Sequence, residues 1–485
     1  MTRLDQTFQT LPTDLYIGGT WRPGSDGARF DVLNPADETV IASVASATIA
    51  DADAALDAAE TAFADWAARP PRERAEVLRR AFELMTERLP DFARLITLEN
   101  GKARADAMGE AAYAAEFFRW FAEEAVRADG LMTRGPSTNA RILVQQKPAG
   151  IAVLVTPWNY PAAMGTRKIA PALAAGCPVI IKPASETPLT MLALMPLLEE
   201  AGVPPGLVNV LPSRQTGALV DHMLHDPRVR VVSFTGSTQV GRKLLHGAAD
   251  QVLKPAMELG GNAPLIVFED ADLDQAVQGA MLAKMRNLGE ACTAANRFYV
   301  HENVAEAFAD RFTAAMAALT LGNGLDDGVD VGPLVNADTR DKVHAFVTDA
   351  LDRGATLRLG GTLPEGPGFY YPPTVLTGVP ADAACVKDEI FGPVAAIQTF
   401  ADQDEVIRRA NDTEYGLVAY VFTGDLKRGL QVSERLDYGM VGLNRGLVSD
   451  PAAPFGGTKQ SGLGREGGHE GMLEFMETQY ISVEW

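Results

Sequence analysis

The chain has 485 residues, of which 47% are hydrophobic, and its 43 basic and 63 acidic side chains give a formal net charge of −20. A chain of this length exceeds a single hydrophobic core, so we expect two large domains and a smaller accessory element. The hydrophobic fraction is typical of a globular enzyme and excludes disorder as the main state. The strong negative charge repels phosphodiester backbones and anionic lipids, so neither nucleic acid nor a membrane surface is a predicted partner.

The first ten residues, MTRLDQTFQT, contain no apolar leader segment. No later run approaches the roughly 18 apolar residues that a membrane span requires. The three cysteines (Cys177, Cys292 and Cys385) are an odd, scattered set, which argues against a disulfide framework and fits a reducing compartment. We therefore predict a cytoplasmic protein. The one close histidine pair, His222 and His225, has no cluster of further ligands around it, so no metal site is predicted.

Residues 48–127 are predicted to be helical, because apolar residues recur there at helical spacing, with a break between the first two helices at Pro70-Pro71. Residues 139–155 then have strand character, interrupted at 148–150. We expect the first half of this segment to be an arm that leaves the domain and the second half to be a buried core strand.

Strands and helices alternate after this point. The strands are VII (179–181), LVNVL (207–211), VRVVSF (229–234) and APLIVF (263–268), and a helix is expected to begin near Ser237. Such alternation predicts a parallel sheet covered on both faces, as in a doubly wound, mononucleotide-binding domain.

A second α/β unit is expected after about residue 260. Helices are predicted near 272–286 and 303–318, followed by a Gly- and Asp-rich loop at 322–333 and by helix-to-strand alternation to about residue 444. The tail FMETQYISVEW alternates apolar and polar side chains and is predicted to be a strand. Because this strand has no obvious local partner, we expect it to pair with another subunit.

Cys292 lies in the segment MRNLGEACTAANR. A lone cysteine is most often a small buried hydrophobe. Its neighbours here are polar or small, including Asn287 and Glu290, rather than an apolar stripe. This pattern predicts an exposed loop or a helix start where backbone N–H groups lower the pKa of the thiol. Cys177 and Cys385 lie in apolar segments, where packing alone accounts for them.

Glu258 precedes two glycines and a predicted strand in MELGGNAP. A single glutamate is most often a capping or surface carboxylate, but apolar, glycine-rich surroundings predict a desolvated carboxyl with a raised pKa, suited to activating water. Trp158 and Asn159 directly follow the strand IAVLV. Ligands of open α/β sheets bind beyond the carboxyl ends of strands, which favours a site there, although an Asn between prolines is also common in plain turns.

Gly236 ends the strand VRVVSFT and opens a helix that carries a second glycine, Gly241. Such a helix start can accept phosphate, but this spacing without a P-loop Lys-Ser/Thr is weak evidence by itself. Lys182 ends the strand VIIK. A lysine there is often simply solvated, but at the carboxyl edge of a sheet it can bind a ribose or a phosphate.

Seven motifs occur in one order along the chain. They are PWNYP (157–161), KPASETP (182–188), FTGS (234–237) before a helix, ELGGNAP (258–264), GEACTAANR (289–297), EIFGPV (389–394) and PFGGTKQSGLGRE (454–466). Through them the chain resembles the aldehyde dehydrogenase superfamily over nearly its whole length, and within it the succinate-semialdehyde dehydrogenases. The resemblance implies an α/β fold with a doubly wound nucleotide-binding domain, a second α/β catalytic domain and a β-strand oligomerisation arm.

The resemblance also implies a mechanism. A cysteine thiolate attacks the aldehyde carbon, the tetrahedral adduct passes hydride to a nicotinamide ring, and water hydrolyses the resulting thioester. Cys292 matches the nucleophile, Asn159 and the Cys292 backbone N–H match the oxyanion donors, and Glu258 matches the general base. Lys168 and Glu466 match positions of a proton route to solvent.

The matching cofactor positions are Trp158, Lys182, Gly236, Ser237, Leu259, Glu389 and Phe391. Many NAD-preferring members carry a glutamate three residues after the lysine, which would repel a 2′-phosphate. Here that residue is Ser185, which leaves room and a hydroxyl donor, so we predict NADP as the preferred cofactor and NAD as the alternative. The neighbouring Glu186 opposes this preference if it turns toward the site.

Three residues match the positions at which relatives bind the distal carboxylate of succinic semialdehyde: Arg167, Arg286 and Ser449. Arginine suits this role because it can bind a carboxylate in a bidentate manner. Each of the three also has a purely structural explanation: a salt bridge for either arginine and a turn for Ser449. Ala294 stands where relatives with a regulatory disulfide carry a second cysteine, so this switch is not expected. Arg445 replaces a glutamate of the best-known enzymes.

The predicted function is therefore the oxidation of succinic semialdehyde to succinate, with glutaric semialdehyde or another small aldehyde as the alternative substrate. A catalytically inactive nucleotide-binding homologue and a thioester or ester hydrolase are the other readings. By analogy, residues 1–127 and 147–258 form the cofactor domain and 259–445 the catalytic domain. Residues 128–146 and 446–485 form the oligomerisation arm of a homodimer or homotetramer.

Overall fold

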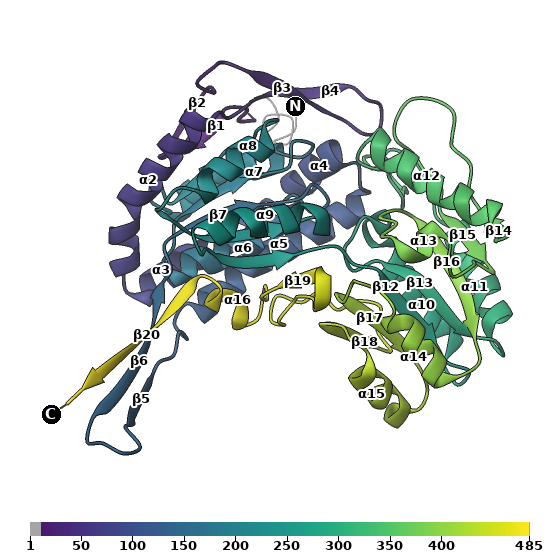
Figure 1. Ribbon diagram of the computed structural model, residues 1–485. Helices are drawn as coiled ribbons and strands as arrows, with labels where there is room; N and C mark the ends of the chain where they lie inside the picture. Colours follow the sequence, from purple (N-terminus) through teal and green to yellow (C-terminus); the bar gives the residue numbers. More distant parts are fainter. Residues whose placement is uncertain (1–10, 485) are drawn as a thin grey trace.

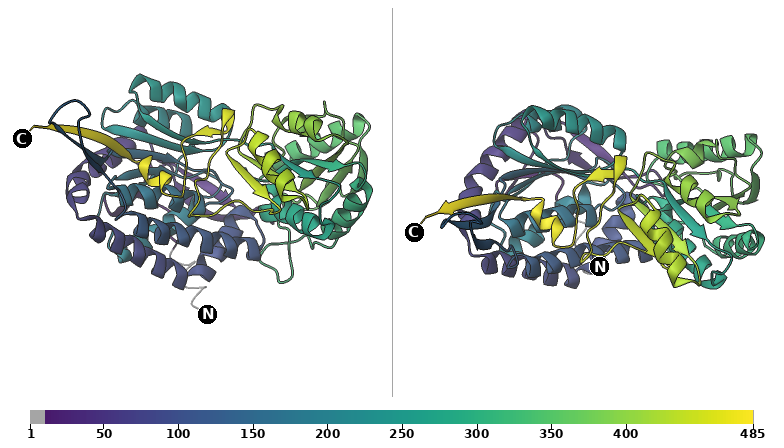
Figure 2. Two further views of the ribbon diagram at one scale, coloured as in Figure 1. Left: turned by 90° about the horizontal axis from the view of Figure 1, so that it is seen from below. Right: turned by 60° about the horizontal axis from the view of Figure 1, so that its bottom comes forward.

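The computed structural model describes residues 11–484. The N-terminal decapeptide, for which we predict no leader segment, lies outside the described residues. Two α/β lobes lie side by side, and a narrow sheet extends away from the first lobe (Figures 1 and 2). Within the described part of the chain, no helix has both the length and the apolar character needed to cross a membrane.

The first lobe is built on an eight-stranded sheet with the order β19-β11-β10-β7-β8-β9-β1-β2. Its strands are β1 (Leu15–Ile17), β2 (Thr20–Arg22), β7 (Ile151–Val155), β8 (Val179–Lys182), β9 (Val208–Val210), β10 (Val229–Thr235), β11 (Lys254–Glu258) and β19 (Gly462–Leu463). Strands β7 to β11 are parallel, and antiparallel strands lie at both edges. β7 and β8 are Val-, Ile- and Leu-rich and fully buried, as expected for strands with helices on both faces.

Helices cover both faces of this first sheet. They are α2 (Ile49–Ala68), α3 (Pro71–Glu87), α4 (Leu89–Asn100), α5 (Arg104–Glu124), α6 (Ala163–Ala175), α7 (Leu189–Ala201), α8 (Thr216–Leu224) and α9 (Thr238–Asp250). One core contains α3, α5, α6 and α7, and the other contains α2 and α8. The predicted helical stretch 48–127 is confirmed, including its break at Pro70-Pro71. A hairpin of β3 (Arg29–Leu33) and β4 (Val40–Ala45) was not predicted from the sequence.

The second lobe contains a seven-stranded sheet with the order β14-β15-β16-β13-β12-β17-β18. Its strands are β12 (Ala263–Val267), β13 (Ala295–His301), β14 (Thr356–Leu359), β15 (Thr374–Thr377), β16 (Val394–Phe400), β17 (Val418–Phe422) and β18 (Met440–Leu443). Its helices are α10 (Leu273–Met285), α11 (Ala305–Ala317), α12 (Ala337–Asp352), α13 (Ala384–Lys387), α14 (Gln403–Asn411) and α15 (Leu426–Arg435), with the 3-10 turns η1 (Arg286–Gly289) and η2 (Lys459–Ser461) and the short helix α16 (Glu470–Leu473) elsewhere. All its strands except β14 run parallel, so the predicted second α/β unit is confirmed.

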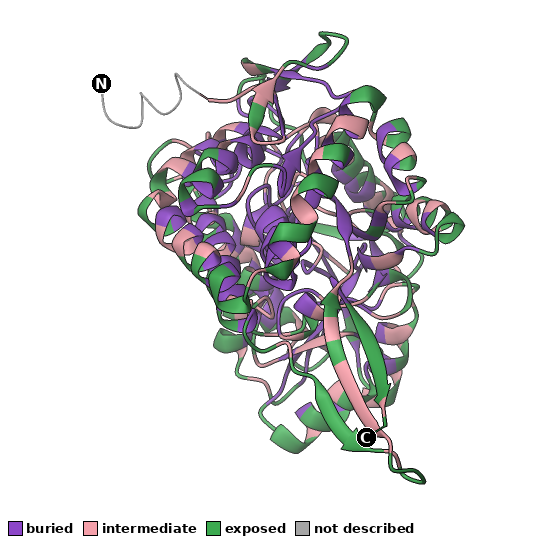
Figure 3. Ribbon diagram, turned by 90° about the vertical axis from the view of Figure 1, so that its left-hand side faces the viewer, coloured by how far each residue is buried: buried purple, intermediate pink, exposed green. Residues whose placement is uncertain are grey.

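The projecting sheet has the order β20-β6-β5 and consists of β5 (Leu131–Arg134), β6 (Arg141–Pro148) and β20 (Met476–Val483). Its residues are mostly exposed or half-buried, in contrast to the lobes (Figure 3). The C-terminal strand has a partner in its own chain that the sequence did not indicate, because β20 pairs antiparallel with β6 along its length, while its pairing with another subunit stays a prediction. The two strands are more than 300 residues apart, so no local sequence pattern indicates this pairing. Within 446–485, β19 joins the first lobe instead.

The two lobes meet at the ends of the strands of their sheets. β7 and β10 are neighbours in the first sheet, and the chain leaves β7 toward one side and reaches β10 on the other. Their carboxyl ends therefore form the topological switch point at which open α/β sheets bind ligands. The chain leaves β11 at Glu258 and enters β12 five residues later at Ala263, and Cys292 lies just before β13. The carboxyl edge of the first sheet thus faces the amino edge of the second.

Candidate active site

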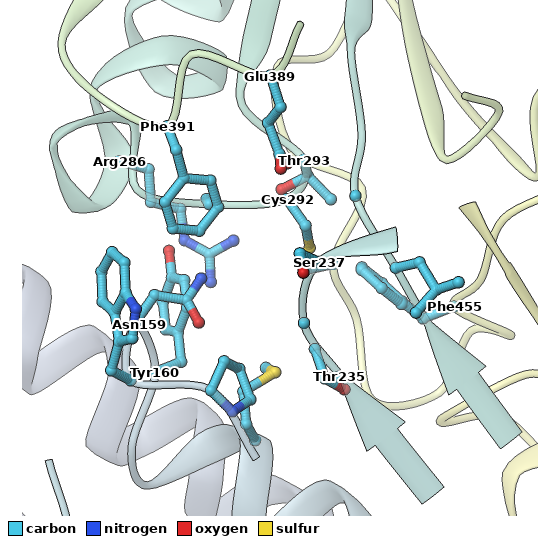
Figure 4. A pocket seen from close by; sticks show the side chains of 18 of the residues that line it. Asn159, Tyr160, Thr235, Ser237, Arg286, Cys292, Thr293, Glu389, Phe391 and Phe455 are labelled. Carbon is cyan, nitrogen blue, oxygen red and sulfur yellow. The ribbon is translucent and has the colours of Figure 1, made fainter. Parts of the chain in front are cut away.

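A cavity of about 240 Å³ lies between the two lobes. Eleven of the residues singled out from the sequence line it: Trp158, Asn159, Arg167, Gly236, Ser237, Leu259, Arg286, Cys292, Glu389, Phe391 and Ser449. Figure 4 shows the Cys292 sulfur between the side chains of Asn159 and Arg286 on one side and Ser237 on the other. Lys182 and Ser185 do not line this cavity, and neither does Glu258, although its neighbour Leu259 does.

Cys292 lies in a turn and is half-buried, so the prediction of an exposed loop or helix start is wrong. The pKa of its thiol is raised to about 12, mainly by burial and then by the carboxylates of Glu389 and Glu258. The polar neighbours suggested a solvated segment, but Asn287 and Glu290 are fully buried and form hydrogen bonds inside the protein. At neutral pH the thiol must therefore lose its proton to a base before it can act as a nucleophile.

Glu258 ends β11 and is buried, as its apolar and glycine-rich surroundings predicted. Its pKa is raised well above the usual value, mainly by desolvation and then by the carboxylate of Glu466, while Arg167 and Lys168 oppose the shift. The Oε2 atom of Glu258 has no hydrogen-bond partner among the described residues. A buried carboxyl with a raised pKa and a free oxygen can accept a proton from a thiol or from water at neutral pH.

Asn159 is buried at the mouth of the first sheet, and its side chain points into the cavity (Figure 4). Its Nδ2 atom donates a hydrogen bond to the carbonyl oxygen of Glu290 at 2.9 Å. Because a side-chain amide has two N–H donors, one hydrogen remains for an oxygen atom beside Cys292. This arrangement can stabilise negative charge on a carbonyl oxygen.

Lys168 and Arg167 form a buried ionic cluster with Glu466. Lys168 Nζ hydrogen-bonds Glu466 Oε1 and also lies 2.9 Å from Ser233 Oγ. Arg167 Nε lies 2.7 Å from Glu466 Oε2, and the guanidinium packs over the ring of Phe455 at 4.2 Å. Glu466 thus compensates part of the Arg167 charge, while the Nη2 atom of Arg167 has no hydrogen-bond partner within the described residues.

Arg286 lies in η1, against two tyrosines that sequence reasoning missed. Its guanidinium lies 5.7 Å from the ring centre of Tyr113 and 5.3 Å from that of Tyr160, and both rings line the cavity. Burial would lower the pKa of Arg286, but Tyr160, Tyr113 and the Asp106 carboxyl hold it above the usual value. Tyr160 is part of PWNYP and could have been included, whereas Tyr113 lies in α5, far from every motif in the sequence.

The other end of the cavity carries the predicted cofactor positions. The rings of Trp158 and Phe391 meet edge to face at 5.3 Å. Glu389 Oε1 accepts the Gly261 N–H at 3.0 Å, and burial raises the pKa of this carboxyl to about 7. A Cβ atom on Gly260 would lie 3.0 Å from the Tyr415 ring and 3.2 Å from Glu389 Oε2, so a larger residue there would crowd this wall. Two aromatic rings with a carboxylate nearby are groups that can hold a nicotinamide and its ribose.

A second cavity, of about 310 Å³, contains Ser185, Glu186 and Arg214. Ser185 Oγ donates to Glu186 Oε2 at 3.3 Å. Lys182 is buried, and its pKa is lowered to about 8, mainly by burial and also by the charge of Arg214, while Glu186 opposes the shift. Among residues 11–484 no group hydrogen-bonds to Lys182 Nζ. A buried ammonium whose charged neighbours, Glu186 and Arg214, line this cavity fits an anionic or hydroxyl-bearing ligand there, such as the adenosine ribose of a dinucleotide.

The histidine pair has an ordinary structural role. His222 Nε2 lies 2.7 Å from Asp53 Oδ1, and His225 Nε2 lies 3.0 Å from Asp250 Oδ2. Within the described ranges, no cluster of three or more His, Cys, Asp or Glu side chains could hold a metal ion.

Comparison with known proteins finds relatives that match nearly the whole chain. The model of the aldehyde dehydrogenase family matches residues 21–481. A succinate-semialdehyde dehydrogenase from Paenarthrobacter nicotinovorans is 55% identical over 92% of this chain and 99% of its own length. A glutarate-semialdehyde dehydrogenase from Pseudomonas putida is 46% identical, with 98% of each chain covered.

Among solved structures, a crystal structure described as an NADP-dependent enzyme from E. coli superimposes with a TM-score of 0.97 at 46% identity, covering 98% of both chains. The family match covers nearly all of the sequence, and the fold agrees over the same length. The chain therefore belongs to the aldehyde dehydrogenase family and is an NAD(P)-dependent aldehyde dehydrogenase.

Proposed function

We propose that this enzyme oxidises succinic semialdehyde to succinate through a thioester on Cys292, with NADP as the preferred cofactor. The observation that carries the substrate proposal is the presence of Arg167, Arg286 and Ser449 in the same cavity as Cys292. Two guanidinium groups and a hydroxyl there can bind a carboxylate several atoms from the reacting carbonyl. The similarity to a succinate-semialdehyde dehydrogenase supports the same substrate.

Cys292 Sγ forms a bond with the aldehyde carbon, and the carbonyl oxygen becomes an oxyanion that accepts hydrogen bonds from Asn159 Nδ2 and the Cys292 N–H. A bound nicotinamide would take up the hydride released from this adduct. The Cys292 thiol releases its proton to water before the sulfur attacks. After the thioester has formed, Glu258 removes a proton from the attacking water. The cluster of Lys168 and Glu466 lies beside Glu258 and can carry that proton onward.

The cofactor preference rests on charges near Ser185. Lys182 and Arg214 place two cations near a cavity that also contains the Ser185 hydroxyl, and together they would bind the adenosine 2′-phosphate. Glu186 is the opposing charge, and its contact with Ser185 must open for the phosphate to bind. The similarity to a structure described as NADP-dependent supports the same preference.

Arg286 is expected to be the stronger of the two carboxylate anchors, because Arg167 already contacts Glu466. Changing Arg286 to Gln is expected to raise the KM for succinic semialdehyde about 10- to 100-fold, which corresponds to the loss of one charged hydrogen bond, with little change in kcat. Steady-state kinetics with butanal, which lacks the carboxylate, should show no such rise. Arg311→Gln, at an exposed ion pair with Asp274, is the matched control. An equal effect on both aldehydes would contradict the assignment.

The test of the proposal is a panel of semialdehydes of increasing length, assayed with NADP and with NAD by absorbance at 340 nm. We expect the highest kcat/KM with succinic semialdehyde and NADP. A higher value with glutaric semialdehyde would favour the alternative substrate, which the similarity to a glutarate-semialdehyde dehydrogenase also supports. A higher value with NAD would remove the cofactor proposal without affecting the substrate proposal.

We also propose that the enzyme is a cytoplasmic homodimer or homotetramer. The outer strands of the arm, β5 and β20, leave unpaired edges and expose Leu131, Met132, Tyr480 and Ile481. Exposed strand edges with apolar side chains are characteristic of surfaces that pair with another chain. The proposed domains correspond to the two large sheets and the arm, except that β19, within the proposed arm segment 446–485, belongs to the first sheet.

A further inference from the structure

Asn159 is held by its backbone carbonyl as well as by its side chain. Its carbonyl oxygen accepts one hydrogen bond from Lys102 Nζ at 2.7 Å and another from Asn287 Nδ2 at 3.1 Å. Lys102 is fully buried and paired with Glu110 at 2.5 Å. Glu110 also accepts the backbone N–H groups at the start of α6 at 2.8 and 3.3 Å. The first lobe therefore fixes one side of Asn159 through a completely buried ion pair.

Asn287 fixes the other side, and it belongs to the segment that carries the nucleophile. Its Nδ2 atom also donates to the carbonyl oxygen of Glu290 at 2.8 Å. That carbonyl is the acceptor to which the Asn159 amide is anchored at 2.9 Å. The Asn287 amide thus bridges two carbonyls, one on the loop after β7 and one two residues before Cys292. A displacement of either loop would break at least one of these bonds.

The backbone of Asn287 has an unfavourable conformation that the surroundings maintain. Asn287 and Leu288 have φ values of 53° and 43°, in the left-handed region. Such values cost free energy in residues other than glycine, although Asn tolerates them best. The Asn287 N–H donates to Asp106 Oδ2 on α5 at 3.0 Å, so the turn is attached to the first lobe at a second point. Strained backbone that persists in this way is common at functional sites.

We infer that Asn287 is a positioning residue, which sets the separation between the oxyanion donor Asn159 and the nucleophile Cys292 across the boundary between the lobes. This inference rests on the proposed role of Asn159. The loss of one of these hydrogen bonds alone could be tolerated. Because Asn159 and Asn287 donate to the same acceptor, the Glu290 carbonyl oxygen, the loop after β7 and the loop before Cys292 should move together. Since a misplacement of about 1 Å can cost roughly 100-fold in rate, the effect of losing Asn287 should appear in kcat.

The test is a double-mutant cycle of Asn287→Gly and Asn159→Ala, assayed with a simple aliphatic aldehyde so that the result does not depend on the semialdehyde proposal. Glycine accepts the left-handed backbone and removes only the amide. Alone, Asn287→Gly should lower kcat about 10- to 100-fold with the KM values for aldehyde and cofactor changed less than about threefold. In the Asn159→Ala background the same change should have almost no further effect, because the side-chain amide that Asn287 is proposed to position is then absent.

Asn287→Asp, which keeps the shape and loses the donor, repeats the cycle if the glycine variant does not fold. Asn209→Asp is the matched control. Asn209 lies in β9, away from the cavity, and its fully buried amide donates to the Gly206 carbonyl at 2.8 Å. The variant should leave kcat unchanged. Additive losses in the double variant, or an unchanged kcat in the single variant, would overturn the inference. Failure of the semialdehyde panel would instead affect only the proposed substrate.

Discussion

Replacing Cys292 with Ala is expected to lower the rate of aldehyde oxidation at least about 10⁴-fold, because Cys292 is the only thiol among the described residues that line the cavity. Cofactor binding should survive, since the thiol is a small group at one end of a larger site. NADPH formation followed at 340 nm measures the first effect, and calorimetric titration of the variant with NADP measures the second.

The other two cysteines provide matched controls for this result. Cys177 and Cys385 are both completely buried, and burial raises the pKa of each thiol to about 11. Cys385→Ala should retain nearly full activity, with at most a small loss of stability from the shortened side chain. If Cys292→Ala keeps more than a few per cent of the activity while Cys385→Ala loses it, the nucleophile has been assigned to the wrong residue.

Changing Glu258 to Gln is expected to reduce steady-state turnover about 10³-fold, the usual contribution of a general base. The amide fills the same space in the buried position but cannot accept a proton from water. Hydrolysis of the thioester should then limit the reaction, so rapid mixing should give a burst of NADPH that approaches one equivalent per active site, followed by a very slow phase.

Glu124→Gln is a suitable control, because Glu124 is also buried and pairs with His469 at 2.8 Å, but unlike Glu258 it is not among the groups that shift the pKa of the Cys292 thiol. It should show neither the burst nor the slow phase. A Glu258→Gln enzyme that turns over at the normal rate would exclude Glu258 as the base that activates water.

The strand and helix succession could be predicted from the sequence because it depends on local patterns. The spacing of apolar residues in 48–127 predicts helices with one buried face. The continuous apolar runs in β7 and β8 predict strands that are buried on both faces. Pairing between distant segments could not be predicted. β20 pairs with β6, and β19 pairs with β11, although no sequence pattern in these strands specifies the partner. Any exposed strand edge of suitable length could accept such strands.

The candidate catalytic groups can be recognised through motifs, but their environments cannot. The polar residues around Cys292 suggested a solvent-exposed segment, whereas in the structure they are buried in a hydrogen-bond network. The contact of Arg167 with Glu466 joins residues almost 300 positions apart, and Tyr113 enters the cavity from a helix without any motif. Burial and pKa depend on what packs around a residue, and that information comes only from the tertiary structure.

The most direct measurement of the mechanism is the mass of the Glu258→Gln enzyme after brief exposure to succinic semialdehyde and NADP, followed by acid quenching and peptide mapping. We expect one added succinyl group per chain, located on the peptide that contains Cys292. NADPH formation without that adduct, or an adduct on Cys177 or Cys385, would contradict it.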